Sequence, residues 1–443
     1  MWIKRTSVSG KKGTYYYHQL MRSYRDGNSS RQEVLLNLGC LDEMTEKRLK
    51  NLARRLDNNP YQFIPQEDAA LLPMKRYGAT FLLNKAFEIT STRRFADDYM
   101  EFLHLDKHSV DYVFLLLAYY SFQQGEESLE SFLESHFVHG VDEVDGERLM
   151  EAIAMFCRFR PLYPGLDVTY KTMKEMNDLS IEYLVKAKVA PEFGSKRNNI
   201  SISVASNLAG FPLNYHWSYS SPRHFLKSGE NTIYATMDEE NELHRMGVKY
   251  LTYISEKRLC AILGLDALDT LRETCVFEPF ETYFNGVCVY NGLKVIFRRT
   301  ASKDDGSWVE DIFLTNVVDL QEKQLFVLME NTSYTDNYFY RIFVPREVEV
   351  ARGVLTEKKL IDAIVAVSFS RLYMEFQLVQ RLEPFGVSLE DVYNIFRDSR
   401  ILQVGKEKHK ILIHTAYTEE QTHILELISF NHSFQNRNGG VEQ

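Results

Sequence analysis

Two runs of apolar and β-prone residues near the amino terminus are separated by polar turn residues, a pattern typical of paired strands. Residues 14–24 are rich in aromatic and β-prone side chains, and residues 32–38 form a second run of this kind. Between them, the sequence Asp-Gly-Asn at 26–28 is typical of a tight turn. The pattern therefore predicts a β-hairpin.

A helix is predicted directly after the hairpin. Leu49, Leu52 and Leu56 form one apolar stripe at three-to-four spacing, and Thr45 is the expected N-cap. Hairpin and helix together make a small module, to which we assign residues 1–60.

The following segment has a helical pattern throughout. Apolar residues recur every three to four positions in four stretches, at 79–87, 110–122, 129–137 and 149–159. We therefore assign a helical domain to residues 61–160.

Beyond residue 160 the pattern changes to short β-rich runs. They lie at 162–169, 200–206, 211–217, 232–237 and 250–255, with a helical stretch at about 239–246. Strands and helices that follow one another in one region predict a mixed sheet of the α/β kind.

Strands without intervening helices come next and predict a β insertion on that sheet at about 278–330. These strands lie at 288–297, 312–315 and 325–328. Two helical patterns and a short strand follow, at 357–382, 389–398 and 411–414. The chain is thus predicted to be a multidomain α+β or α/β protein, with residues 161–443 as its last domain.

The composition is that of a folded protein of several domains, because 443 residues with 44% hydrophobic and 26% charged side chains exceed one ordinary core. No apolar stretch follows the charged residues 1–6, so a secretory signal is not expected. No window reaches the roughly 18 uncharged apolar residues of a membrane span. The five cysteines lack metal-ligand spacing. We expect a cytoplasmic protein with reduced cysteines and no membrane partner.

The net charge of −9 counts against a nucleic-acid partner, but it hides an asymmetry. Residues 1–60 contain twelve Lys and Arg against six Asp and Glu, a net charge of +6, so the other residues carry −15. Double-stranded DNA would meet this end first; a basic surface that is merely solvated is the alternative. The candidate DNA-binding side chains here are Lys11, Lys12, Arg22, Arg25 and Arg31.

Two stretches of the sequence carry a resemblance. The first and more specific one has Gly-Thr-Tyr-Tyr-Tyr at 13–17, Ser-Tyr-Arg-Asp-Gly at 23–27 and Arg-Gln-Glu-Val-Leu-Leu-Asn-Leu-Gly at 31–39. The second has Leu-Asp-Val-Thr at 166–169 and Gly-Phe-Pro-Leu-Asn-Tyr at 210–215. Both resemble DDE-type insertion-sequence transposases, whose catalytic domain is ribonuclease-H-like. The resemblance implies cut-and-paste DNA transposition, a duplex DNA partner and a homodimer across two DNA ends.

Such enzymes hold two divalent metals about 3.5 to 4 Å apart with three carboxylates, and hard Mg²⁺ or Mn²⁺ takes oxygen ligands. The resemblance places the first carboxylate, a metal ligand, at Asp167; a turn cap bonded to Thr169 is the alternative. The second position falls on Thr236. Asp238, two residues on, is either its substitute or a helix N-cap.

The family's third carboxylate lies in a helical signature, Tyr-x2-Arg-x3-Glu-x6-Lys, whose basic residues hold phosphate. Tyr338, Arg341 and Arg352 keep that spacing here, whereas Pro345 replaces the glutamate. Proline offers no ligand and breaks a helix. The substitutes weighed for this position are Glu347 and, farther away, Glu330.

Three hypotheses follow for the function. The leading one is a transposase-like DNA-binding protein with a degenerate active site, in which cleavage and transfer are impaired or lost. The second is an active, metal-dependent transposase whose site is rebuilt from Asp167, Asp238 and either Glu347 or Glu330. The third is a protein-interaction or regulatory module on a transposase scaffold, because a fold alone does not set function.

Overall fold

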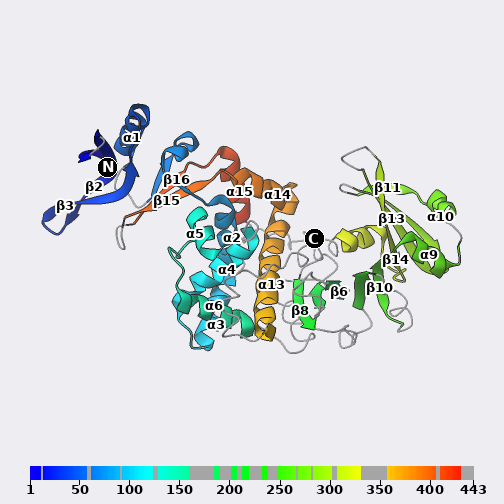
Figure 1. Cartoon of the computed structure of the whole chain (residues 1–443). Helices are drawn as coiled ribbons and strands as arrows, with labels where there is room; N and C mark the ends of the chain where they lie inside the picture. The colour runs from blue at the N-terminus through cyan, green and yellow to red at the C-terminus, as the bar shows by residue number, and fades with distance from the viewer. Residues whose placement is uncertain are drawn as a thin grey trace, which may run out of the picture. The chain divides into compact units, whose positions relative to one another are not determined.

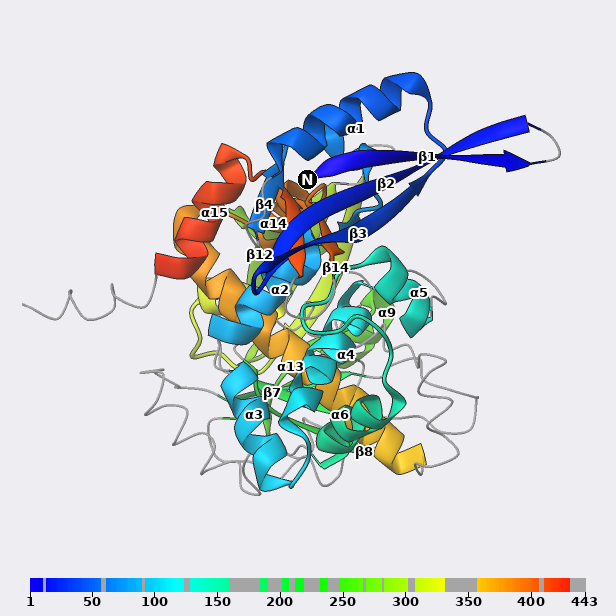
Figure 2. The same ribbon diagram turned by 90° about the vertical axis from the view of Figure 1, so that its left-hand side faces the viewer.

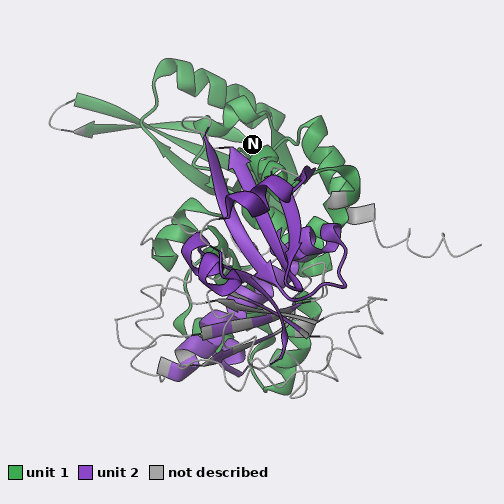
Figure 3. Ribbon diagram, turned by 90° about the vertical axis from the view of Figure 1, so that its right-hand side faces the viewer, with its two compact units in different colours: residues 1–152, 345–347, 377–443 green, residues 153–344, 348–376 purple. Residues whose placement is uncertain are grey.

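Figure 1 shows the computed structural model, which describes residues 1–10, 13–56, 61–89, 92–122, 128–158, 184–189, 201–206, 212–218, 232–237, 247–265, 268–280, 283–301, 307–330, 357–405 and 410–430. The chain divides into two compact units, coloured in Figure 3. Unit 1 comprises residues 1–152, 345–347 and 377–443, and unit 2 comprises residues 153–344 and 348–376. Residues 377–443 thus group with the amino-terminal part of the chain. The mixed α and β composition of the fold is confirmed.

The amino-terminal module of unit 1 begins with an antiparallel sheet of β1 (Trp2–Gly10), β2 (Gly13–Asp26) and β3 (Ser29–Gly39), in the order β1-β2-β3. Strands β2 and β3 confirm the predicted hairpin. The sequence pattern does not predict β1, because Ile3 is buried but residues 4–9 are all exposed. No apolar alternation therefore marks that strand.

The predicted helix follows as α1 (Glu43–Arg55), but its N-cap is Asp42 and not Thr45. The Asp42 carboxylate accepts hydrogen bonds from the Thr45 backbone N–H at 2.9 Å and from the Thr45 hydroxyl at 2.5 Å. The expectation for Thr45 was wrong because an aspartate three residues earlier satisfies the free amide of the first turn. These bonds also lower the pKa of Asp42, the Thr45 hydroxyl contributing most.

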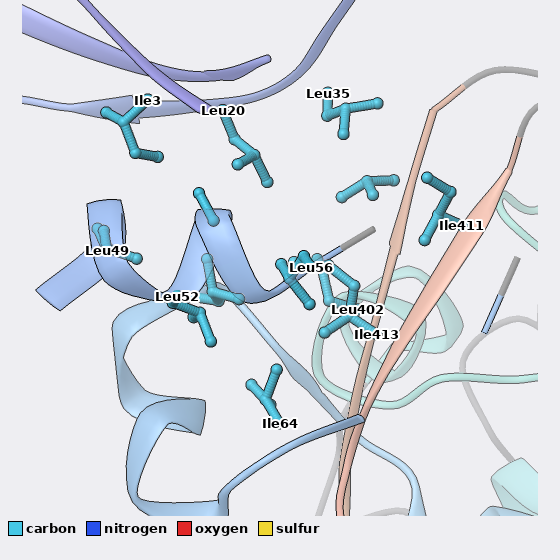
Figure 4. Close-up of a cluster of buried hydrophobic side chains, with 13 residues drawn as sticks. Ile3, Leu20, Leu35, Leu49, Leu52, Leu56, Ile64, Leu402, Ile411 and Ile413 are labelled. Atoms are coloured by element: carbon cyan, nitrogen blue, oxygen red, sulfur yellow. The ribbon is translucent and has the colours of Figure 1, made fainter. Parts of the chain in front are cut away.

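Leucines of α1 complete a core shared by two sheets of unit 1. Figure 4 shows Leu49 and Leu52 together with Leu20 from β2 and Leu402 and Ile413 from later strands. Those later strands belong to a four-stranded sheet in the order β4-β16-β15-β5. Its members are β4 (Tyr61–Ile64), β5 (Lys75–Arg76), β15 (Arg400–Val404) and β16 (Ile411–Thr415).

The remaining helices confirm most of the predicted helical pattern. They are α2 (Gly78–Ile89), α3 (Thr92–Phe102), α4 (Val110–Phe122), α5 (Leu129–Ser135), α6 (Gly146–Arg158), α9 (Glu256–Leu263), α10 (Asp269–Thr274), α13 (Glu357–Leu382), α14 (Leu389–Phe396) and α15 (Glu419–Phe430). Gly78 is required where α2 meets α14, because a Cβ there would stand 1.8 Å from the Phe396 carbonyl oxygen. No helix in the described ranges is long and apolar enough to cross a membrane.

Unit 2 contains a nine-stranded sheet in the order β11-β12-β13-β14-β10-β9-β6-β7-β8. Strand β9 runs parallel to both β6 and β10, and the other pairs are antiparallel. The strands are β6 (Leu184–Val189), β7 (Ser201–Ser206), β8 (Pro212–Ser218), β9 (Thr232–Met237), β10 (Lys249–Tyr253), β11 (Phe277–Phe280), β12 (Tyr283–Tyr290), β13 (Leu293–Ala301) and β14 (Trp308–Thr315).

Four of the predicted strands, at 200–206, 211–217, 232–237 and 250–255, are confirmed by β7, β8, β9 and β10. The predicted strand at 288–297 is a hairpin instead, because Asn291 and Gly292 turn the chain with φ of 51° and 78°. The predicted strand at 325–328 lies in a helix over 322–330. A short buried apolar run is compatible with either structure. The predicted elements at 162–169 and 239–246 lie outside the described residues.

Candidate nucleic-acid interface

The amino-terminal sheet has a part that only two strands form. Nine residue pairs join β1 to β2, from Trp2 with Met21 to Gly10 with Gly13. Strand β3 pairs only with residues 18–26 of β2. Residues 6–10 and 13–17, here called the ribbon, therefore have no third strand beside them within the described part of the chain. Figure 2 shows β1 and β2 continuing beyond the end of β3.

The ribbon exposes aromatic side chains on both of its faces. Tyr15, Tyr16 and Tyr17 are 44%, 44% and 45% exposed, and Val8 is 49% exposed. Residues opposite each other in an antiparallel ladder share a face, so Val8 and Tyr15 lie on one face and Tyr16 on the other. Neither face is used as core within the described part of unit 1, which is unusual for β structure with three consecutive tyrosines.

Basic side chains predominate near the ribbon, and Arg5 Nη1 lies 4.0 Å from Glu46 Oε2 on α1. Residues 1–25 contain six Lys and Arg and not one Asp or Glu. Lys4 and Arg5 stand at the base of the ribbon, and the Arg5 guanidinium carbon lies 3.7 Å from the centroid of the Tyr16 ring. The predicted contact residues Lys11 and Lys12 follow β1 in the sequence and lie outside the described residues.

Arg22 has a structural partner. It is 4% exposed, and its Nε and Nη2 atoms donate to Glu33 Oε2 on β3 at 3.0 and 2.7 Å. A buried, hydrogen-bonded guanidinium of this kind holds two strands together, so Arg22 is not counted among the candidate DNA contacts. Its sequence neighbours gave no hint, because the partner lies eleven residues away across the ladder.

Arg25 and Arg31 lie at the opposite end of β2 from the ribbon, beside the β2–β3 turn. Both are exposed. Arg31 Nε lies 3.1 Å from Asp26 Oδ2, so a carboxylate balances this part of the sheet. Of the candidate cations that the structure describes, Arg22 and Arg31 thus have carboxylate partners.

A polar contact that sequence analysis missed fixes α1 against the base of the ribbon. Buried His18 places Nε2 3.2 Å from Glu46 Oε2 on α1 and Nδ1 3.3 Å from the Gly39 carbonyl oxygen. The hydrogen bond from Lys50 is the main reason that the pKa of Glu46 is lowered, and burial opposes it. A histidine that alternates into the buried face of β2 was the available signal.

The candidate catalytic carboxylates Asp167, Asp238 and Glu347, like the candidate phosphate ligands Arg341 and Arg352, lie outside the described residues. Glu330 is described, at the end of the helix over 322–330. Its Oε1 lies 3.1 Å from Nη2 of Arg298, which is 3% exposed. Glu330 therefore balances a buried arginine. Elsewhere in the described ranges, no group of three His, Cys, Asp or Glu residues could hold a metal.

The residues at the positions implied by the resemblance do not fit a pair of metal ions. Among these positions, Asp167 alone supplies a carboxylate, since Thr236 and Pro345 occupy the other two. Strand β6, which precedes β7 in the described chain, reads Leu-Val-Lys-Ala-Lys-Val and has no acidic residue. Hard divalent ions need several oxygen ligands at once, and one aspartate does not meet that need.

One known protein family matches the amino-terminal module. Residues 3–67 match the IS1634 family transposase, N-terminal domain. The matched part spans β1 to β4 together with α1, and so includes the ribbon. No curated protein matches the chain. The family match supports an insertion-sequence transposase and a transposase-like role.

Proposed function

We propose that this chain is a transposase-like protein that binds double-stranded DNA, and in which cut-and-paste strand cleavage and transfer are impaired or lost. The observation that carries the proposal is the match of residues 3–67 to a transposase amino-terminal domain. The first 25 residues of the chain contain no Asp or Glu. Cationic side chains bind duplex DNA by releasing its condensed counterions. DNA binding is the property this module retains.

A ribonuclease-H-like catalytic scaffold in unit 2 is part of the proposal. Strands β6, β7 and β8 are consecutive and antiparallel, and β9 returns to the free side of β6 in parallel, followed by β10. This order supports the fold that the resemblance implies. Strands β11 to β14 extend the sheet beyond β10 and agree with a β insertion at about 278–330.

We propose the loss of catalysis because too few side chains at the implied positions can serve as metal ligands. Phosphoryl transfer by this class of enzyme depends on two metals that stabilise the attacking and leaving oxygens. Threonine at 236 and proline at 345 supply no ionised oxygen to such a pair. Glu330, one of the substitutes for the third position, already neutralises Arg298. A site rebuilt from Asp167, Asp238 and Glu347 is the competing hypothesis, with Mg²⁺ or Mn²⁺ as its cofactor.

The first experiment measures DNA binding by the full chain. Fluorescence anisotropy with a labelled random-sequence duplex is recorded over a series of salt concentrations. We expect a Kd that rises steeply with salt, as it does when phosphates are neutralised by lysine and arginine. Absence of binding at low salt would refute the proposal and favour the protein-interaction module. Size-exclusion chromatography of the complex tests the homodimer implied by the resemblance.

The second experiment measures strand cleavage. Supercoiled plasmid is incubated with the protein and Mg²⁺ or Mn²⁺, and nicked product is quantified on agarose gels. We expect no metal-dependent nicking above the level of the Asp167→Ala variant. Nicking by the wild-type chain that disappears with Asp167→Ala, and also with Asp238→Ala, would show an active enzyme with a rebuilt carboxylate site.

A further inference from the structure

We propose that the ribbon enters the major groove of duplex DNA and that its exposed side chains contact base edges there. This inference rests on the proposed DNA binding and adds the element that makes the contact. Two other cations of the module, one on β2 and one on β3, already have carboxylate partners. Arg22 is bonded to Glu33, and Arg31 is balanced by Asp26.

The shape of the ribbon is the first argument. Two paired strands lie about 4.8 Å apart, and five residues at about 3.4 Å each give a length of roughly 17 Å. The major groove of B-DNA, about 12 Å wide, admits a two-stranded ribbon, whereas the minor groove, about 6 Å wide, does not. A third strand would make the element too wide, and β3 stops pairing at His18, before the ribbon begins.

The side chains of the ribbon are the second argument. Ser7, Ser9, Thr14 and Tyr16 carry hydroxyls on one face, and these both donate and accept hydrogen bonds. Such groups pair with the donors and acceptors of base edges, and an apolar group such as Val8 contacts a thymine methyl. None of these side chains is needed for the core, since all are exposed.

Charge is the third argument, and it separates DNA from a protein partner. An edge strand with unpaired backbone groups also accepts a strand from another chain. Residues 1–25 contain Lys and Arg without any acidic residue, in a protein of net charge −9. A polyanion is therefore attracted to this end, while the same basic end of a second copy is repelled.

The test compares two double variants that add the same charge at opposite ends of β2. In Ser7→Glu with Ser9→Glu the new carboxylates lie on the ribbon, and in Ser30→Glu with Gln32→Glu they lie on β3 near the β2–β3 turn. All four positions are exposed, so both variants keep the fold, which circular dichroism checks. We expect the ribbon variant to raise the Kd for duplex DNA at least about tenfold, and the control less than about threefold.

A groove competition on the wild-type chain gives a second measurement that needs no variant. Methyl green, which occupies the major groove, is expected to displace the protein, and netropsin, which occupies the minor groove, is expected to leave it bound. Equal weakening by the two double variants, or displacement by netropsin alone, would overturn the ribbon proposal while DNA binding stands. A dimer that dissociates only in the ribbon variant would overturn it in favour of strand pairing between copies. A wild-type chain that binds no duplex overturns the proposed function itself.

Discussion

The amino-terminal sheet that contains the ribbon and the β12–β14 part of the nine-stranded sheet are both antiparallel β structure with cationic side chains. They differ in where the balancing carboxylates lie. In β13, Arg298 is paired with Glu330 and Arg299 with Glu310. Residues 1–25, which include the ribbon, supply no carboxylate, and Arg5 at its base meets Glu46 of α1 at 4.0 Å. The comparison teaches that the number of arginines does not identify a nucleic-acid surface. The positions of the carboxylates are the better guide, because a guanidinium paired with a carboxylate attracts phosphate only weakly.

The largest effect is expected from breaking the neutralisation of Arg298. Glu330→Ala should lower the free energy of unfolding by about 3 kcal/mol, because it leaves a guanidinium that is 3% exposed without its carboxylate. Urea denaturation measures the change. Glu322→Ala, at an exposed position in the same helix, should change it by less than about 0.5 kcal/mol. Unaltered stability of Glu330→Ala together with lost divalent-metal binding would instead make Glu330 a metal ligand.

A pH titration extends the comparison to a basic side chain whose charged form is disfavoured by burial. His414 in β16 is 8% exposed, and burial lowers its pKa from 6.5 to about 4. Between these values the unfolded chain binds a proton that the folded chain does not. The free energy of unfolding should therefore fall, by about 2 kcal/mol, as the pH falls from 6.5 to 4. His414→Gln should flatten this slope in thermal melts, while exposed His423→Gln should keep it.

A smaller effect is expected from the second carboxylate of the β13 region. Glu310 lies 2.7 Å from Arg272 Nε and 2.8 Å from Arg299 Nε, and its side chain is 17% exposed. Glu310→Ala should lower the free energy of unfolding by about 1.5 kcal/mol, because it removes two charge-assisted hydrogen bonds from partly exposed arginines. Asp269→Ala is the control. It removes a contact to the same Arg272 from a side chain that is 78% exposed, and should change stability by less than about 0.5 kcal/mol.

Sequence patterns predicted the elements that bury one regular face. Helices α1 and α14 each have such a face, and both, like the β2–β3 hairpin, were found where they were expected. Elements held by distant partners were harder to predict. Strand β4 is four residues long and pairs with β16, so that Tyr61 stands beside Leu412. No local periodicity predicts a contact between residues so far apart in the chain.

The charged residues of the candidate site were hard to interpret from the sequence for the same reason. Counting Lys and Arg indicated a basic amino-terminal module, and the family match covers the same part of the chain. The count gave Arg22 and Arg25 equal weight, although the structure buries the first beside Glu33 and exposes the second. Which cation is balanced depends on strand register, and register is decided by pairing across the sheet. The carboxylates Asp167, Asp238 and Glu347 stay predictions.

The smallest effect should come from a single lysine at the base of the ribbon. Lys4 is exposed, so Lys4→Ala should leave stability within about 0.5 kcal/mol of the wild type. If its ammonium contacts one phosphate, the slope of log Kd against log salt concentration should fall by about one, uniformly across DNA sequences. Lys47→Ala, on the exposed face of α1, is the matched control and should leave the slope unchanged. Equal changes in both variants would mean that the whole module attracts DNA diffusely, and the contrast between the ribbon and the rest of the sheet would then lose its functional meaning.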